Sequence, residues 1–247
     1  MNWLKKLTVF LACILFITCG IQEIYYLPQV PPTFVETRLN TDADIRIPSL
    51  SYYYYAGGYR IFYRIYISDN DTVGITQSDI NNISSILVSD FNYFASLTDP
   101  TNTSSIPNNN TFINRSYFEL ELEGITDITT VLTTAGGNVA IQFPSTIGER
   151  PVLKINENEY ILCRSSGRQG QTFSPVPEDR YFFSSPELND YANANSTVNA
   201  DVAGRSGASR HAYVCMYIVA TGQNPENFNR IYSKPTLISI FKLPSRN

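Results

Sequence analysis

Apolar and polar side chains alternate along several stretches of the chain, and this two-residue period is typical of strands that bury one face. The clearest stretch is 59–68, with Tyr59, Ile61, Tyr63, Ile65 and Ile67 on one face and Arg60, Phe62, Arg64 and Tyr66 on the other. Further strands are predicted at 117–124, 138–143, 151–155, 159–164, 212–222 and 232–244. In 117–124 the glutamates at 119, 121 and 123 are expected on a solvated face. The pattern predicts a mainly β protein.

The period changes between Ser78 and Leu97, where apolar residues recur at three- and four-residue spacing: Ile80, Ile83, Leu87, Phe91 and Phe94. This spacing predicts one amphipathic helix that packs its apolar stripe on the strands. Thr76 and Asp79 match a capping box at its start. Residues 98–111 are rich in Asn, Ser, Thr and Pro, which predicts a long exposed loop. Helix and loop together form an insertion at about 69–115.

The first residues have the composition of an export signal. Lys5 and Lys6 precede an apolar run at 7–17. That run is too short to span a bilayer, which needs about 20 apolar residues, but it matches the apolar region of a secretory signal. We therefore expect residues 1–18 to be a signal peptide and the protein to be exported.

The end of this signal resembles that of a bacterial lipoprotein. Phe16-Ile17-Thr18-Cys19 is similar to a lipobox, in the relaxed form seen in spirochaetes. The resemblance implies that Cys19 is acylated and becomes the new N-terminus, which would anchor the chain to a membrane of the cell envelope, the outer membrane or surface being favoured over the inner membrane. The alternative is an ordinary cleaved signal in which Cys19 occurs by chance.

The residues after Cys19 predict a tether followed by one domain. Residues 19–33 contain Pro28, Pro31 and Pro32, which favour an extended backbone, so we expect the β-sandwich domain to span 34–247. Loss of Lys5 and Lys6 with the signal changes the formal net charge from −4 to −6. A mildly acidic chain without a dense basic run is not expected to bind nucleic acid.

Two cysteines remain once Cys13 in the signal and Cys19 at the anchor are set aside. Cys163 and Cys215 both lie in apolar strand contexts of an exported chain, so one disulfide between them is a prediction of the sequence. Two separately buried thiols are the alternative.

The strands at 56–68 and 211–243 resemble parts of a fibronectin type III or immunoglobulin-like domain. Residues 56–68 are similar to the third strand of such a domain, and 211–243 to the last two. The Tyr213-x-Cys215 step is similar to the tyrosine corner, in which the phenol hydrogen-bonds back across the corner. The resemblance implies an antiparallel immunoglobulin/fibronectin type III-like sandwich with one inserted amphipathic helix.

Two groups of side chains are candidates for binding. Arg164, Arg168, Arg205 and Arg210 flank the last predicted strands and would form an anion site if they converged. The run Tyr52–Tyr55 offers flat rings with a polar rim, which could stack on a glycan. The alternatives without a ligand are that the arginines lie in flexible connectors and that the tyrosines alternate between buried and exposed positions.

No catalytic group, cofactor or metal is assigned from the sequence. A calcium-like loop begins at Asp69, but Val73 and Ile80 stand where oxygen ligands are needed. Ser209 and the single histidine, His211, lie two positions apart on the chain and lack the setting of a hydrolase triad. We therefore expect a lipid-anchored, non-enzymatic binding or structural module with a protein or glycan partner. The alternatives are a glycan-binding module that uses exposed tyrosines and, less favoured, an anchored hydrolase.

Overall fold

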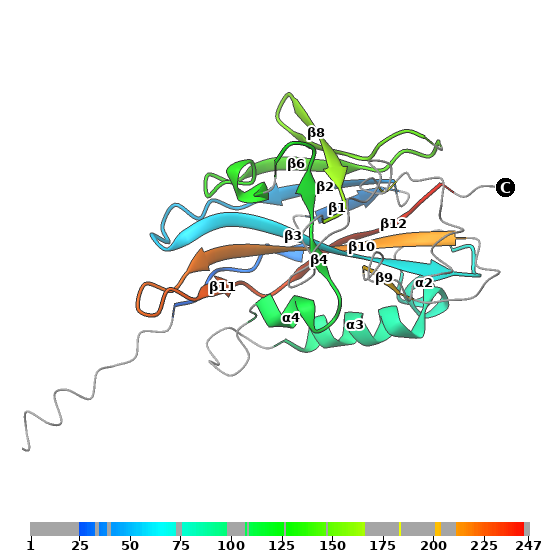
Figure 1. The fold of residues 1–247 in the computed structure, drawn as a ribbon, viewed down its shortest axis with the longest axis horizontal. Helices are drawn as coiled ribbons and strands as arrows, with labels where there is room; N and C mark the ends of the chain where they lie inside the picture. The colour runs from blue at the N-terminus through cyan, green and yellow to red at the C-terminus, as the bar shows by residue number, and fades with distance from the viewer. Residues whose placement is uncertain are drawn as a thin grey trace, which may run out of the picture.

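The computed structural model describes most of the predicted domain (Figure 1). The described residues are 25–32, 35–38, 41–72, 76–97, 107, 109–125, 127–146, 148–165, 183, 201–203 and 211–244. The predicted signal peptide and Cys19 lie outside them. So does most of the predicted exposed loop, at 98–106 and 108.

Two sheets pack face to face and form a sandwich. The first sheet has the order β1 (Val35–Arg38), β2 (Asp42–Ile47), β6 (Gly137–Gln142), β7 (Val152–Ile155), β8 (Asn158–Cys163), β5 (Glu121–Leu122). The second sheet is built on β10 (His211–Gln223) and β3 (Ala56–Ser68), with β11 (Arg230–Tyr232), β12 (Thr236–Lys242), β4 (Phe118–Glu119) and β9 (Val202–Ala203) around them. All pairings are antiparallel except that of β9 with β3. The predicted mainly β, antiparallel sandwich is confirmed.

Alternate side chains of the two long strands, β3 and β10, point to opposite sides of the second sheet. On β3, Tyr59, Ile61, Tyr63 and Ile65 point into the core between the sheets, as the alternation predicts. Its opposite face, with Phe62 and Tyr66, points away from the first sheet. On β10, Tyr213, Cys215, Tyr217 and Val219 lie on that same outer side. The second sheet is therefore buried on both faces.

Helices cover this outer face, which makes the molecule three layers thick (Figure 1). They are α2 (Gln77–Ile83), α3 (Ser85–Ser96) and α4 (Asn109–Ile113). The capping box of Thr76 and Asp79 is present at the start of α2. The single predicted helix is broken at Ser84, whose extended backbone ends α2 while its hydroxyl accepts from Ile86 N at 3.2 Å and begins α3. α4 lies at the end of the predicted loop, where Phe112 is fully buried.

The stretch 117–124 is two short strands in different sheets. β4 pairs with β3 in the second sheet, whereas β5 pairs with β8 in the first. The crossing places Leu120 and Leu122 in the core between the sheets. Glu119 is only partly exposed and not fully solvated as predicted, because its carboxylate pairs with the buried guanidinium of Arg60. A connection between sheets therefore replaces the predicted continuous strand.

The domain begins before the predicted boundary at residue 34. Leu27 and Val30 are fully buried in the core between the sheets. Gln29 donates to Pro235 O at 3.0 Å, and the Thr236 hydroxyl donates to Val30 O. Residues 25–32 thus belong to the domain and not to a tether, because two apolar side chains and these hydrogen bonds hold the proline-rich segment in place.

The strands that carry the immunoglobulin-like resemblance lie side by side. β10 pairs with β3 along most of its length and with β12 on its other edge. The hydroxyl of Tyr213 donates to Asn70 O at 2.8 Å and accepts from Thr72 N at 2.9 Å. This bond joins β10 to the connection after β3, and not to residues just upstream of Tyr213.

Candidate functional site

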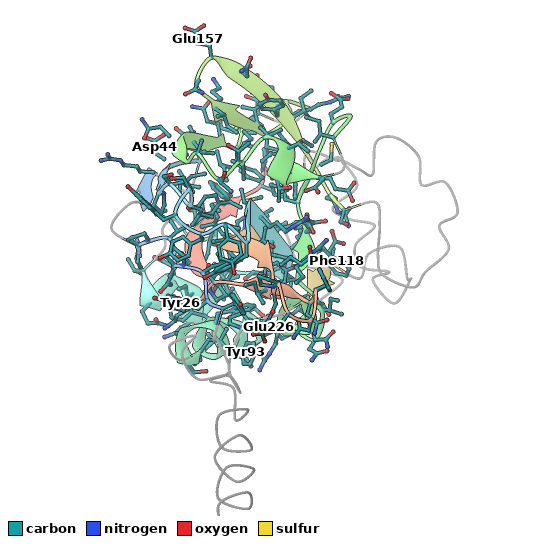
Figure 2. All side chains as sticks on the ribbon, turned by 90° about the vertical axis from the view of Figure 1, so that its left-hand side faces the viewer. Tyr26, Asp44, Tyr93, Phe118, Glu157 and Glu226 are labelled. Atoms are coloured by element: carbon teal, nitrogen blue, oxygen red, sulfur yellow. The ribbon has the colours of Figure 1, made fainter. Side chains whose placement is uncertain are left out.

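Aromatic side chains gather at one end of the sandwich, which we call the tyrosine tip: Tyr25, Tyr26, Tyr52, Tyr53, Tyr54, Tyr55 and Phe228. It combines the first described residues, the turn before β3 and the loop between β10 and β11, which lie at the left-hand end in Figure 1. Gln223 N donates to Tyr55 O at 2.9 Å, and the Tyr55 hydroxyl donates to Tyr26 O at 2.6 Å. Figure 2 views the molecule from this end, where Tyr26 and Glu226 are labelled.

The tip has an inner and an outer set of rings. Tyr53 and Tyr55 are partly buried against the core between the sheets. The outer rings are exposed, by 92% for Tyr52, 78% for Tyr54, 71% for Phe228 and 42% for Tyr26. Tyr54 meets Tyr55 edge-on, with ring centroids 5.3 Å apart and planes at 86°. The alternating burial predicted for Tyr52–Tyr55 is present, although these residues form a turn and not a strand.

Backbone contacts fix this turn to the strands beneath it. Leu50 is buried, and its N–H donates to Thr134 O at 2.7 Å. A Cβ on Gly222 would lie 2.3 Å from Tyr55 O, so only glycine lets β10 approach the turn so closely. Burial raises the pKa of Tyr55. The outer rings therefore stand on a framework of strands and not on a free loop.

Charged groups are scarce at the tip. The segments 25–32 and 48–55 contain none, and 223–230 contains Glu226 and Arg230 only. These two charges are opposite, so the three segments together are neutral. An exposed aromatic surface without net charge favours contact with an amphipathic ligand over electrostatic recognition.

His211 lies at the opposite end of β10, and the described residues around it do not form a hydrolase site with it. Its strand partner is Ser68, and its buried Nδ1 has no hydrogen-bond partner among the described residues. The nearby carboxylate of Asp71 pairs with Lys242, whose hydrogen bond lowers the pKa of Asp71. A triad needs a carboxylate that orients the histidine, and Asp71 does not do so. Ser209 lies outside the described residues.

Arg164, the first arginine of the predicted anion site, is paired within the protein. Arg164 is buried and makes a bidentate pair with Asp201, with Nε at 2.7 Å from Oδ2 and Nη2 at 2.5 Å from Oδ1. Tyr63 donates to the same carboxylate at 3.0 Å. Because Arg164 already neutralises this buried carboxylate, it does not offer its fork to a ligand. Arg168, Arg205 and Arg210 lie outside the described residues.

The predicted disulfide is not formed. Cys163 and Cys215 are both free and buried. Cys163 lies in β8 of the first sheet, whereas Cys215 lies in β10 and points to the helices on the far side of the second sheet. Burial raises the pKa of Cys163 to about 11 and that of Cys215 to about 12, so both are inert thiols. The alternative of two separately buried thiols holds.

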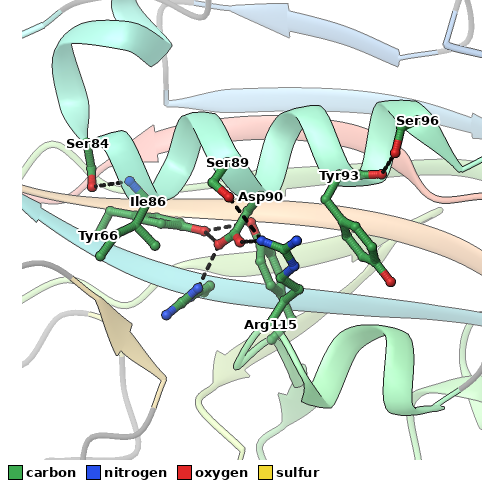
Figure 3. A network of polar contacts seen from close by, with 10 residues as sticks. Tyr66, Ser84, Ile86, Ser89, Asp90, Tyr93, Ser96 and Arg115 are labelled. Carbon is green, nitrogen blue, oxygen red and sulfur yellow. Dashed lines mark hydrogen bonds and ion pairs between the residues drawn. The ribbon is translucent and has the colours of Figure 1, made fainter.

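One buried carboxylate, on the inward face of α3, was not predicted as a site from the sequence (Figure 3). Asp90 is 1% exposed and accepts from Arg64 Nη1 and the Tyr66 hydroxyl, each at 2.6 Å, and from Arg115 Nη1 at 3.2 Å. The Tyr66 hydroxyl also lies 2.9 Å from that of Tyr117. The signal in the sequence is position, because Asp90 stands three residues after Leu87 and four before Phe94, within the apolar stripe. Its fully paired state indicates a structural role.

Comparisons with known proteins found no match: no family model fits the chain, and no curated protein or solved structure is significantly similar to it. Among the helices that the structure describes, none has the length and apolar composition to cross a membrane. Within the same described residues, no three His, Cys, Asp or Glu side chains gather as they would around a metal ion. The tyrosine tip is therefore the surface on which a functional proposal rests.

Proposed function

We propose that the protein is a lipid-anchored lipoprotein of a bacterial cell envelope, and that its sandwich domain is a non-enzymatic binding or structural module. The proposed anchor is supported by the order of features at the start of the chain: two positive charges, an apolar run, and a lipobox-like tetrad that ends at Cys19. A single acyl chain binds a membrane only marginally, so the several chains of a bacterial lipoprotein would supply stable attachment.

The binding role is supported by the tyrosine tip. Tyrosine and phenylalanine are large and rigid, and exposed clusters of them are typical of interaction surfaces. The tip is held by hydrogen bonds from β10 and from the turn at Leu50, so it is ordered before any partner arrives. The surroundings of His211 give no support to the anchored hydrolase, because Asp71 is engaged by Lys242.

A glycan-binding module is the second candidate, and the exposure of Tyr52 and Tyr54 favours it. A sugar ring stacks on a flat aromatic face, best on rings that share a plane. The ring pairs of the tip are edge-on instead, with Tyr25 and Tyr53 at 83° and 76° to Tyr55. These angles reduce the support for a glycan platform.

The anchor is tested by replacing its acceptor. Cys19→Ser should release the protein into the soluble fraction of the producing bacterium and abolish incorporation of a labelled fatty acid. Cys13→Ser is the matched control, because it removes the other cysteine of the signal and should leave labelling unchanged. The proposal is wrong if the wild-type protein takes up no fatty acid and Cys19→Ser stays in the membrane fraction.

A further inference from the structure

We propose that the tyrosine tip contacts the membrane that carries the anchor, with Tyr26, Tyr52, Tyr54 and Phe228 in the headgroup layer. This inference rests on the proposed acylation of Cys19. It adds two points to the proposed function: how the domain is oriented on the membrane, and that lipid is the ligand of the tyrosine tip. The occupant we infer is the lipid headgroup region itself.

The position of the tip in the chain is the first argument. Six residue steps separate Cys19 from Tyr25, the first described residue and itself part of the tip. Six extended residues span at most about 20 Å. β3 and β10 have 13 residues each, so the opposite end of the sandwich lies about 40 Å further away. An anchor at Cys19 therefore keeps the tip within about 20 Å of the membrane, closer than the domain's far end when the sandwich stands upright.

A tether this short also raises the effective concentration of the tip at the membrane. Contacts made through a short linker are intramolecular, at effective concentrations in the millimolar range. Even rings that bind lipid weakly on their own will then be in contact for much of the time. The tip needs no high intrinsic affinity to orient the domain.

The chemistry of the tip fits the interface between lipid and water. Tyrosine rings concentrate at the headgroup level because the ring body is apolar and its hydroxyl is polar. The segments of the tip carry one acidic and one basic group, Glu226 and Arg230, so they are neutral. The mature chain as a whole is acidic, which would repel anionic lipids elsewhere on its surface. Aromatic insertion, and not charge attraction, is the expected mode of contact.

Phe228 supplies an independent observation. Its backbone is left-handed, with φ of 58°, which is an outlier for a bulky residue. The hydrogen bonds that hold this loop include Phe228 N to Asn224 O at 2.8 Å, Asn224 N to Asn229 O at 2.9 Å, and Gln223 Nε2 to Phe228 O at 3.0 Å. An asparagine or glycine would adopt this conformation at lower cost. The loop instead presents an apolar ring to the outside, which indicates a use for that ring.

The mature chain offers a clean fluorescence probe of this contact. The sequence has one tryptophan, Trp3, and it lies in the predicted signal peptide. Tyr52→Trp therefore gives a protein with a single tryptophan at the tip, at a side chain that is 92% exposed. Ser145→Trp is the matched control. Ser145 is also exposed and lies near the other end, where its neighbour Phe143 stacks on Phe241 beside the start of β10.

The experiment reconstitutes each acylated protein into phosphatidylcholine vesicles, with and without brominated acyl chains. Tyr52→Trp should emit at shorter wavelength on the vesicles and lose fluorescence to the bromine, whereas Ser145→Trp should do neither. If the acylated protein floats with the vesicles but Tyr52→Trp is not quenched, the tip inference is overturned and the anchor stands. A shift of Tyr52→Trp emission by soluble oligosaccharides, without quenching by brominated lipid, overturns it in favour of glycan binding.

Failure of the anchor itself is distinguished by the same probe on another background. Tyr52→Trp is combined with Cys19→Ser, and the soluble protein is titrated with vesicles to millimolar lipid. Quenching at high lipid concentration supports contact by the tip even in the absence of acylation. Both proposals are overturned if the emission of this double variant stays unchanged across the titration and the wild-type protein also takes up no fatty acid.

Discussion

Tyrosine is used in two opposite ways in this molecule, under the helices and at the tip. Tyr66 and Tyr117 are at most 1% exposed, their hydroxyls bond to each other, and that of Tyr66 also donates to Asp90. Tyr52 and Tyr54 are 92% and 78% exposed. A buried phenol needs a hydrogen-bond partner, whereas an exposed one is satisfied by water or by a ligand. The buried tyrosines therefore help to specify the fold, whereas the exposed ones are available for binding.

The largest effect is expected at Asp90, which organises the buried set. Asp90→Ala leaves Arg64, Arg115 and Tyr66 without their common acceptor. Removing one partner of a buried ion pair costs about 3–5 kcal/mol, so the free energy of unfolding should fall by about that amount in urea. Asn92→Ala, two residues away at an exposed position of α3, is the control and should change it by less than about 0.5 kcal/mol. A loss below about 1 kcal/mol for Asp90→Ala would show that the network is not structural.

Alkaline pH should destabilise the protein through the same buried phenols. Burial raises the pKa of Tyr66, Tyr117 and Tyr217 well above their usual value of 10.0, and that of the Cys215 thiol to about 12. The unfolded chain ionises at the usual values, so it releases protons that the folded protein retains. The stability present below about pH 9 is therefore lost as the pH rises towards 12. Urea midpoints at pH 7.5, 9.5 and 10.5 should fall in that order, and equal midpoints would contradict the pKa shifts.

The sequence predicted the regular parts of both regions because their signals are local. Alternation along 59–68 assigned both faces of β3, and the spacing of Ile80, Ile83 and Leu87 assigned the helical face that covers it. The break at Ser84 was missed, since a serine is compatible with a helix interior as well as with a cap. Elements were therefore predictable, but their exact ends were not.

What the sequence could not predict depends on pairs of residues far apart in the chain. Arg164 meets Asp201, and Gln223 meets Tyr55, only because of the register between strands. The run Tyr52–Tyr55 is conspicuous in the sequence, but Tyr26 and Phe228 join it only through that register. Leu27 and Val30 were assigned to a tether because three prolines flank them, yet burial of two apolar side chains decides their position.

The smallest effect on stability is expected at the outer tip. Tyr52→Ser combined with Tyr54→Ser removes two rings that are mostly in water, so the free energy of unfolding should stay within about 0.5 kcal/mol of the wild type. Tyr55→Phe is the internal comparison, because it deletes the hydroxyl that donates to Tyr26 O at 2.6 Å and should cost about 0.5–1.5 kcal/mol. Urea unfolding of the three proteins measures both numbers. If the double variant lost more stability than Tyr55→Phe, the outer rings would be part of the fold. An unchanged stability would show that the fold does not need the outer rings.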